Sequence, residues 1–207
     1  MTSVLGIDLG TSNSVVAVCE DGTVTVIADE DGHQIHPSAV AFMPDGSVLV
    51  GTRARAGIIQ RPNETVVSAK RLIGRRVQSD EVVKTRARMG YEIVDQEQGV
   101  AVKIRDQLHS LESISGLILR HLRDQAEQFL GRPAQKAVIT VPAYFDDNQR
   151  QATRRAGQMV GLEVLRIVNE PTAAAFSYGY GGKRSHRIAV FDLGGGTFDV
   201  SILELGE

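Results

Sequence analysis

Two stretches of the chain share one short pattern, and this repeat most limits the folds that the chain can adopt. GIDLGTSNS at 6–14 and VFDLGGGTFD at 190–199 both lead from an apolar run through Asp-Leu-Gly into a turn of small and hydroxyl-bearing residues. A glycine turn after a strand exposes successive backbone N–H groups, and such a concave set of donors suits a phosphate. The hydroxyl groups of Thr11, Ser12 and Thr197 add donors. Two turns of this kind, facing each other, would hold a polyphosphate from both sides.

Each of the two strands ends in a carboxylate, Asp8 in the first and Asp192 in the second. A carboxylate repels a phosphate, so it fits beside one only if a hydrated Mg²⁺ lies between them. Either copy alone is more often ordinary turn chemistry. Because both copies follow an apolar strand, we favour phosphate binding over ordinary turn chemistry as the role of the pair. The chain has no G-x-x-x-x-G-K-[ST] motif, no G-x-G-x-x-G between strand and helix and no Cys/His set at metal-ligand spacing, so phosphate binding would depend on these two turns.

The composition fits a globular chain and argues against several classes of function. Of the 207 residues, 42% are hydrophobic and 23% are charged, which suits one large domain or two small ones. Basic and acidic residues nearly balance, at 23 against 25, so we expect no nucleic-acid binding. No apolar run approaches the ~20 residues that cross a bilayer, and no leader pattern opens the chain, so we expect no membrane association. The single cysteine, Cys19, lies in an apolar run, and we expect it to be a buried core residue. One cysteine can form no disulfide within the chain, so we expect the protein to be in the reducing cytoplasm.

The N-terminal half reads as short strands separated by breakers. The first three expected strands, joined by glycine turns into a meander, are 4–9, 14–19 and 23–28. Another strand-and-turn region follows. Residues 53–86 are rich in arginine and are expected to form helix or loop, and 91–104 is expected to form a hairpin that turns near Gly99.

The C-terminal half alternates helices and strands. The expected helices are 113–131, 146–161 and 170–181, and the expected strands are 136–142, 162–168 and a strand–turn–strand unit at 188–205. On the first of these helices one face is expected to carry Leu119, Leu122, Ala126, Phe129 and Leu130. Glycines and charges make 179–187 the best linker candidate. A meander followed by helix–strand alternation predicts a mixed sheet with helices on its faces, an α/β fold.

Five long motifs together identify a family. The chain resembles the N-terminal nucleotide-binding domain of the DnaK-type seventy-kilodalton heat-shock chaperones through GIDLGTSNSVVAV, AKRLIGRR, VITVPAYFDDNQRQATRRAG, LEVLRIVNEPTAAAFSYGYG and IAVFDLGGGTFDVSILE. The resemblance covers essentially the whole chain and is loosest at 77–111. It implies an actin-like ATPase fold of two lobes with MgATP in the cleft between them.

The resemblance also implies how the chain divides. Residues 1–37 and 111–180 would form the ribonuclease-H-like base of lobe I, subdomain IA, and 38–110 would be the inserted subdomain IB. Residues 181–207 would begin lobe II, as an incomplete subdomain IIA, so we expect a truncated fragment whose last hairpin has no sheet to join. The chain departs from the family pattern at Asp146, where Asn is usual, at Arg155, where an acid is common, and at Leu111, where Pro is usual.

Site residues follow from the resemblance, position by position. The first phosphate loop would be Gly10, Thr11 and Ser12, and the second would be Gly194, Gly195, Gly196 and Thr197. Asp8 would lie near the metal, and Asp192 would hold metal-bound water.

The resemblance supplies catalytic roles as well. Lys70 would reach the γ-phosphate, and Glu170 would orient the cation's water shell or the attacking water. Asp199 would help to hold a monovalent cation and is a candidate proton acceptor, and Thr197 joins this catalytic set. Without the resemblance, a lone lysine in a basic run is usually solvated surface, a glutamate before a proline is an ordinary helix N-terminal acid and Asp199 is a strand-end polar residue.

Function and partners follow in the same way. The resemblance implies an ATP-hydrolysing module that couples its nucleotide state to the release of unfolded polypeptide, which a further domain would bind. Its cofactors would be ATP or ADP, Mg²⁺ and K⁺, and its partners a J-domain cochaperone and a nucleotide exchange factor. Pro142 and Arg150 resemble the family's coupling residues, and Asp147 and Arg166 resemble surface positions that face the substrate domain and the J-domain. The alternatives are a small-metabolite kinase of the same fold and a filament-forming, actin-like protein.

Overall fold

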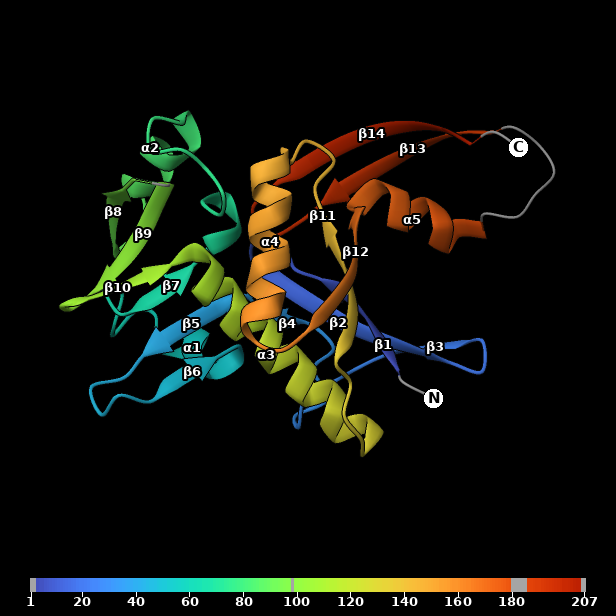
Figure 1. Ribbon diagram of the computed structural model, residues 1–207, viewed down its shortest axis with the longest axis horizontal. Coiled ribbons are helices and arrows are strands. Elements are labelled where there is room, and N and C mark those ends of the chain that lie inside the picture. Colours follow the sequence, from blue (N-terminus) through green and yellow to red (C-terminus); the bar gives the residue numbers. More distant parts are fainter. Residues whose placement is uncertain (1–2, 98, 180–185, 206–207) are drawn as a thin grey trace.

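The computed structural model describes residues 3–97, 99–179 and 186–205 of the chain (Figure 1). Its central element is a mixed sheet in the strand order β12-β11-β1-β2-β3, to which β4 adds by pairing with β2. The strands are β1 (Val4–Asp8), β2 (Asn13–Glu20), β3 (Thr23–Val26), β4 (His36–Pro37), β11 (Lys136–Val141) and β12 (Glu163–Asn169). β11 runs parallel to both β1 and β12, whereas β1, β2 and β3 form the expected antiparallel meander. The α/β architecture expected from the sequence is confirmed.

Helix α3 (Leu111–Leu130) packs on β1 and β2 and provides much of the core. It begins earlier than the sequence suggested, because the Ser110 hydroxyl accepts a hydrogen bond from the Ser113 N–H at 3.1 Å and so caps the helix. The expected apolar face is only partly correct. Phe129 is 56% exposed, because the last turn of the helix packs through Ala126 and Leu130 instead.

Helix α4 (Asp147–Met159) packs on α3 and on β12. Asp146 caps it, because the carboxylate accepts from the Gln149 N–H at 2.9 Å while the Gln149 side chain accepts from the Asp146 N–H at 3.3 Å. Helix α5 (Glu170–Gly179) follows β12 directly and contacts β11 and β12. Within the described residues, no helix combines the length and the apolar character that crossing a membrane requires.

The segment between β4 and α3 forms two small antiparallel sheets. One has the order β6-β5-β7 and the other β10-β9-β8. The elements are β5 (Ala39–Phe42), β6 (Val48–Val50), α1 (Thr52–Ala56), β7 (Thr65–Val67), a 3₁₀ turn η1 (Ala69–Arg71), α2 (Asp80–Arg86), β8 (Glu92–Gln96), β9 (Gly99–Ile104) and β10 (Gln107–Ser110). The hairpin expected at 91–104 is present. β7 was missed within 53–86, because its three residues form a strand only by pairing with β5.

The last hairpin consists of β13 (His186–Leu193) and β14 (Phe198–Leu205), which within the described residues pair only with each other. Side chains alternate between its two faces. One face is open to solvent and carries the exposed apolar side chains Phe191, Leu193, Phe198, Val200 and Ile202. Asp192 and Asp199 face the other way and are partly buried. Most of the expected linker, residues 180–185, lies outside the described residues.

The prediction that Cys19 is a core residue is wrong. Ser14, Val16 and Val18 point to the buried side of β2, and Cys19 follows out of phase with them at the end of the strand. Its thiol is therefore exposed. A cysteine in an apolar run of a strand falls on either face, and the run alone does not decide which.

Two helices approach closely at Gly116, which generates a test of the packing. A methyl group added there would lie 2.9 Å from the carbonyl oxygen of Ala156 on α4 and 3.2 Å from Val160 Cγ1. Because the nearest obstacle is backbone, we expect Gly116→Ala to lower the free energy of unfolding by about 1–3 kcal/mol, although alanine is intrinsically the better helix former. Urea unfolding measures this change. Gln128→Ala, on the exposed side of the same helix, should stay within about 0.5 kcal/mol of wild type, and a Gly116→Ala variant as stable as wild type would contradict the packing.

Candidate functional site

The structure brings the two glycine turns, one from each end of the chain, into direct opposition. A Cβ added to Gly195 would lie 2.9 Å from Ser12 Cβ, and one added to Gly196 would lie 3.2 Å from Ser12 Oγ. The turn between β1 and β2 therefore faces the turn between β13 and β14 with no room for side chains on the second. Backbone of this kind can approach a ligand closely.

The first turn is held by two serines that sequence reasoning did not single out. The Gly10 N–H donates to Ser14 Oγ at 3.2 Å, Ser14 Oγ pairs with Ser38 Oγ at 2.9 Å, and the Ser38 hydroxyl donates to the Gly10 carbonyl at 2.8 Å. Both serines are buried. A Cβ on Gly10 would lie 1.9 Å from the carbonyl oxygen of Asn13, so this position requires glycine. The buried serines could have been suspected only from Ser14 at an inward position of an otherwise apolar strand.

Lys70 and Glu170 form a buried ion pair beside the turns. Lys70 comes from η1 and Glu170 from the first turn of α5, and Lys70 Nζ lies 2.5 Å from Glu170 Oε1. The two side chains are only 8% and 15% exposed. The reading of Lys70 as solvated surface is therefore incorrect. Lys70 also lies over the ring of Phe145, 6.0 Å from its centroid.

The electrostatic environment of Glu170 places further carboxylates near it. Burial raises the pKa of the Glu170 carboxyl, the Lys70 ammonium lowers it, and the charges of Asp8 and Asp192 raise it again. The Asp8 carboxylate accepts a hydrogen bond from the Thr140 hydroxyl at 2.9 Å. Asp8, Asp192 and Glu170 were predicted separately from three parts of the sequence. The charges of the first two thus act on the carboxyl group of the third.

Two small cavities adjoin this group and meet at Tyr144. One, of about 150 Å³, is lined by residues that include Pro142, Glu170, Asp192 and Asp199. The other, of about 200 Å³, is lined by Thr11, Lys70, Arg71, Arg75, Glu81, Tyr144, Phe145 and Thr197. Burial, and then the charges of Asp199 and Glu170, raise the pKa of the Tyr144 phenol. Tyr144 was not among the expected site residues, although it lies in the PAYF stretch between a strand and a helix.

The donor set around these cavities fits a hydrated divalent cation. Asp8, Asp192, Asp199 and Glu170 supply carboxylate oxygens, the ligands that Mg²⁺ takes directly or through water. Burial is the main cause of the raised pKa of Glu170, and the charges of Asp8 and Asp192 raise it further. A cation with two positive charges would relieve the repulsion between these carboxylates, whereas a phosphate placed there alone would increase it.

The four expected coupling residues divide into two kinds. Pro142 lines the smaller cavity, and Arg150 donates to the Phe145 carbonyl at 3.0 Å and to Asn169 Oδ1 at 2.7 Å, so Arg150 connects the loop after β11 to the end of β12. Asp147 and Arg166 are exposed, on α4 and β12, and line neither cavity.

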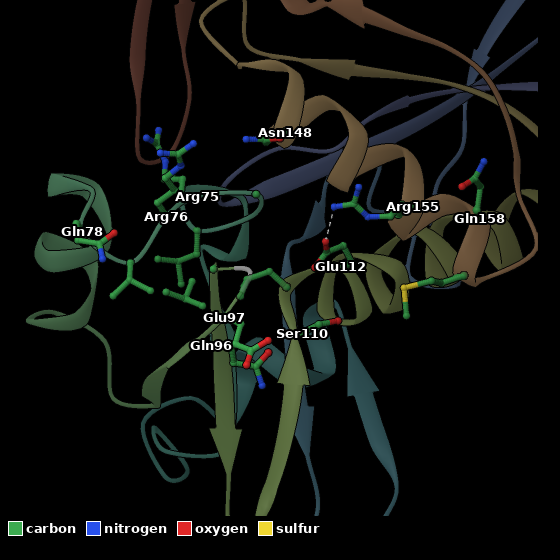
Figure 2. Close-up of a pocket in the computed structure, with 17 residues that line it drawn as sticks. Arg75, Arg76, Gln78, Gln96, Glu97, Ser110, Glu112, Asn148, Arg155 and Gln158 are labelled. Atoms are coloured by element: carbon green, nitrogen blue, oxygen red, sulfur yellow. Dashed lines mark hydrogen bonds and ion pairs between the residues drawn. The ribbon is translucent and has the colours of Figure 1, made fainter.

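A larger cavity, of about 950 Å³, lies elsewhere and contains none of the expected site residues. It is bounded by the loop after η1, by β8 and β9, by the start of α3 and by one side of α4. Figure 2 shows Arg155 of α4 pointing toward Glu112 of α3, where the two make an ion pair at 2.9 Å. Arg155, a departure from the family pattern, therefore joins two helices in this structure.

Comparison with protein families gives one finding for this chain. The model of a family described as Hsp70 protein matches residues 4–207. The match includes both glycine turns and the residues of the ion pair. It also extends across 77–111, where the sequence motifs are least distinct.

The titration of Glu170 tests the described electrostatics. We expect its carboxyl, followed by ¹³C NMR, to have a pKa above the ordinary value of 4.5. Lys70→Met should raise this pKa further, because the ammonium lowers it, whereas Lys103→Met at an exposed position should not change it. The folded chain holds this proton more tightly than the unfolded chain. The contribution of Glu170 to the free energy of unfolding is therefore fully present below pH 4.5 and falls as the pH rises through the raised pKa. A wild-type midpoint at or below 4.5 would contradict the assigned environment.

Proposed function

The chain belongs to the Hsp70 family of ATP-hydrolysing chaperones, which have the actin-like ATPase fold, and we propose that its two glycine turns and the Lys70–Glu170 pair bind and hydrolyse ATP. The observation that carries the proposal is the buried pair itself, because a lysine and a glutamate 100 residues apart meet beside two opposed turns. The stability of the fold does not require a buried ion pair at this place, because well-packed apolar residues often stabilise a protein equally well.

The proposed division of the chain is the one that the resemblance implies, and the strand order supports it. Residues 1–37 and 111–180 contain the six-stranded sheet together with α3, α4 and α5, as a lobe I base would. Residues 38–110 contain the two three-stranded sheets and would be the inserted subdomain. Residues 181–207, which contain the β13–β14 hairpin, would begin the second lobe.

In the proposed mechanism the chain supplies charge and position, as phosphoryl transfer to water requires. The amides of Gly10–Ser12 and of Gly194–Thr197 would hold the phosphates of ATP, and the Lys70 ammonium would balance charge on the γ-phosphate. Glu170, oriented by Lys70, would accept a hydrogen bond from the attacking water. Asp199 would take up its proton.

Asp8, Asp192 and Asp199 would hold cations through their carboxylates and bound water. Mg²⁺, with K⁺ as a second cation, would supply positive charge beside the phosphates. This proposal is supported by the donor set and by the charges of Asp8 and Asp192, which add to the effect of burial in raising the pKa of Glu170.

The proposal extends to regulation and partners. Arg150 contacts the loop that carries Pro142 and also the strand that leads into Glu170, so a change at the nucleotide would reach both. Asp147 and Arg166 are exposed and would be available to a substrate domain that binds unfolded polypeptide and to a J-domain cochaperone. A nucleotide exchange factor would complete the cycle. In a reducing cytoplasm, the exposed Cys19 thiol would stay free. No observation favours the kinase or filament alternatives.

Nucleotide binding is tested by calorimetric titration of MgATP and MgADP into the chain. We expect measurable binding of MgATP, and at least tenfold weaker binding by Lys70→Ala, because that variant removes the ammonium beside the turns and leaves the Glu170 charge unpaired. Lys103→Ala, at a partly exposed position on β9, should bind as wild type does. Thermal unfolding of each variant shows whether it is folded. Absence of any heat with the wild-type chain would refute the proposal for this polypeptide.

Hydrolysis is tested separately in a single-turnover experiment with Glu170→Gln. If Glu170 orients the attacking water, we expect this variant to keep its affinity for MgATP within a few-fold and to hydrolyse ATP about 10²–10⁴ times more slowly. Glu163→Gln, an exposed position on β12 that pairs with Lys136 at 3.7 Å, is the matched control. Equal rates for Glu170→Gln and wild type would remove Glu170 from the mechanism.

A further inference from the structure

Arg71, the neighbour of Lys70, connects three parts of the cleft. From η1, one arm of its guanidinium donates to Glu81 Oε1 on α2 at 2.6 Å, and the other arm donates to the Gly196 carbonyl in the second glycine turn. The side chains of Arg71 and Glu81 are 26% and 27% exposed, so their ion pair is largely shielded from solvent. Arg71 is 125 residues from Gly196 in sequence. No local pattern in the sequence indicated this contact.

The contact is made to a carbonyl, and this has a consequence for the neighbouring amide. The peptide unit is planar and trans, so its C=O and N–H bonds point in opposite directions. Fixing the Gly196 carbonyl toward Arg71 therefore fixes the N–H of Thr197 away from it. That N–H is one of the donors that would hold a phosphate. Arg71 thus sets the direction of a donor that it does not touch.

Few contacts other than the bond from Arg71 hold the second glycine turn in place. Gly196 has no side chain, and a Cβ there would lie 3.1 Å from the Arg71 guanidinium and 3.2 Å from Ser12 Oγ. Within the turn, the Gly194 N–H donates to the Thr197 carbonyl at 2.9 Å, which closes the turn on itself but does not attach it to lobe I. Among the described residues, the bond from Arg71 is the only side-chain hydrogen bond that reaches the Gly194–Gly196 backbone.

We propose that Arg71 is a positioning residue that holds the second glycine turn against the first and aims the Thr197 N–H, with Glu81 fixing the guanidinium. The planar, forked guanidinium is suited to this task, because it can satisfy a carboxylate and a carbonyl at once, whereas a lysine offers a single point charge. The link to hydrolysis rests on the proposed function. The anchoring of the turn does not.

The anchoring is tested without nucleotide, by ¹⁵N relaxation of the Gly196 and Thr197 amides. We expect rigid order parameters near 0.85 in wild type, as is usual for ordered backbone, and values below about 0.6 in Arg71→Ala. Arg71→Lys should not restore order, and Glu81→Gln should give an intermediate value. Arg86→Ala is the matched control, because Arg86 lies on α2, as Glu81 does, but pairs with Asp95 instead of the glycine turn. Order parameters in Arg71→Ala equal to wild type, or full rescue by Arg71→Lys, would overturn the proposal.

The link to hydrolysis is tested with MgATP in single turnover. We expect Arg71→Ala to lower the hydrolysis rate about 10- to 100-fold, since small displacements of positioning groups have effects of that size, while the affinity for MgATP falls less because the other amides remain. An unchanged rate in a variant with a mobile turn would refute the catalytic part of the proposal. If wild type binds no MgATP, the proposed function fails, and the relaxation experiment still decides the anchoring.

Discussion

The ion pair between Lys70 and Glu170 sets the conditions for the rest of the cleft. Desolvating two opposite charges has a free-energy cost of several kcal/mol for each ion, and their attraction offsets it only when the geometry is good. The pair therefore requires η1 and the start of α5 to meet at a fixed separation. That requirement in turn places Phe145 beneath the ammonium and brings the carboxylates of Asp8 and Asp192 close enough to act on Glu170.

Around this pair the cleft is built mainly of backbone. The second glycine turn lies so close to the first that a Cβ added to Gly195 would lie 2.9 Å from Ser12 Cβ. The groups that fix the two turns are Ser14 and Ser38 for the first and Arg71 for the second. A turn of glycines has little conformational preference of its own. Its geometry must therefore be imposed by side chains from the surrounding elements, and a site of this type depends on residues that need not touch a ligand.

The sequence predicted the mixed sheet, the three helices of the C-terminal half and both turns, because each has a local sequence pattern: apolar alternation, helix caps and glycine after a strand. It did not predict β7 or the true orientations of Cys19 and Phe129, because these depend on pairing or packing with distant segments. The carboxylates of the candidate site were found through their position at strand ends or in family motifs. Arg71 and Tyr144 were not, since an arginine in a basic run and a tyrosine two residues after a proline have no distinctive spacing.

The alternation along β13 and β14 gives the last hairpin two chemically different sides. Carboxylates of the candidate site occupy one side, and Phe191, Leu193, Phe198, Val200 and Ile202 lie open on the other. Within the described residues these two strands pair only with each other, and an uncovered apolar surface on such a strand pair is a template for association. The free energy of covering such a surface changes with the solvent. Sulfate and similar salts strengthen apolar burial, whereas urea weakens it.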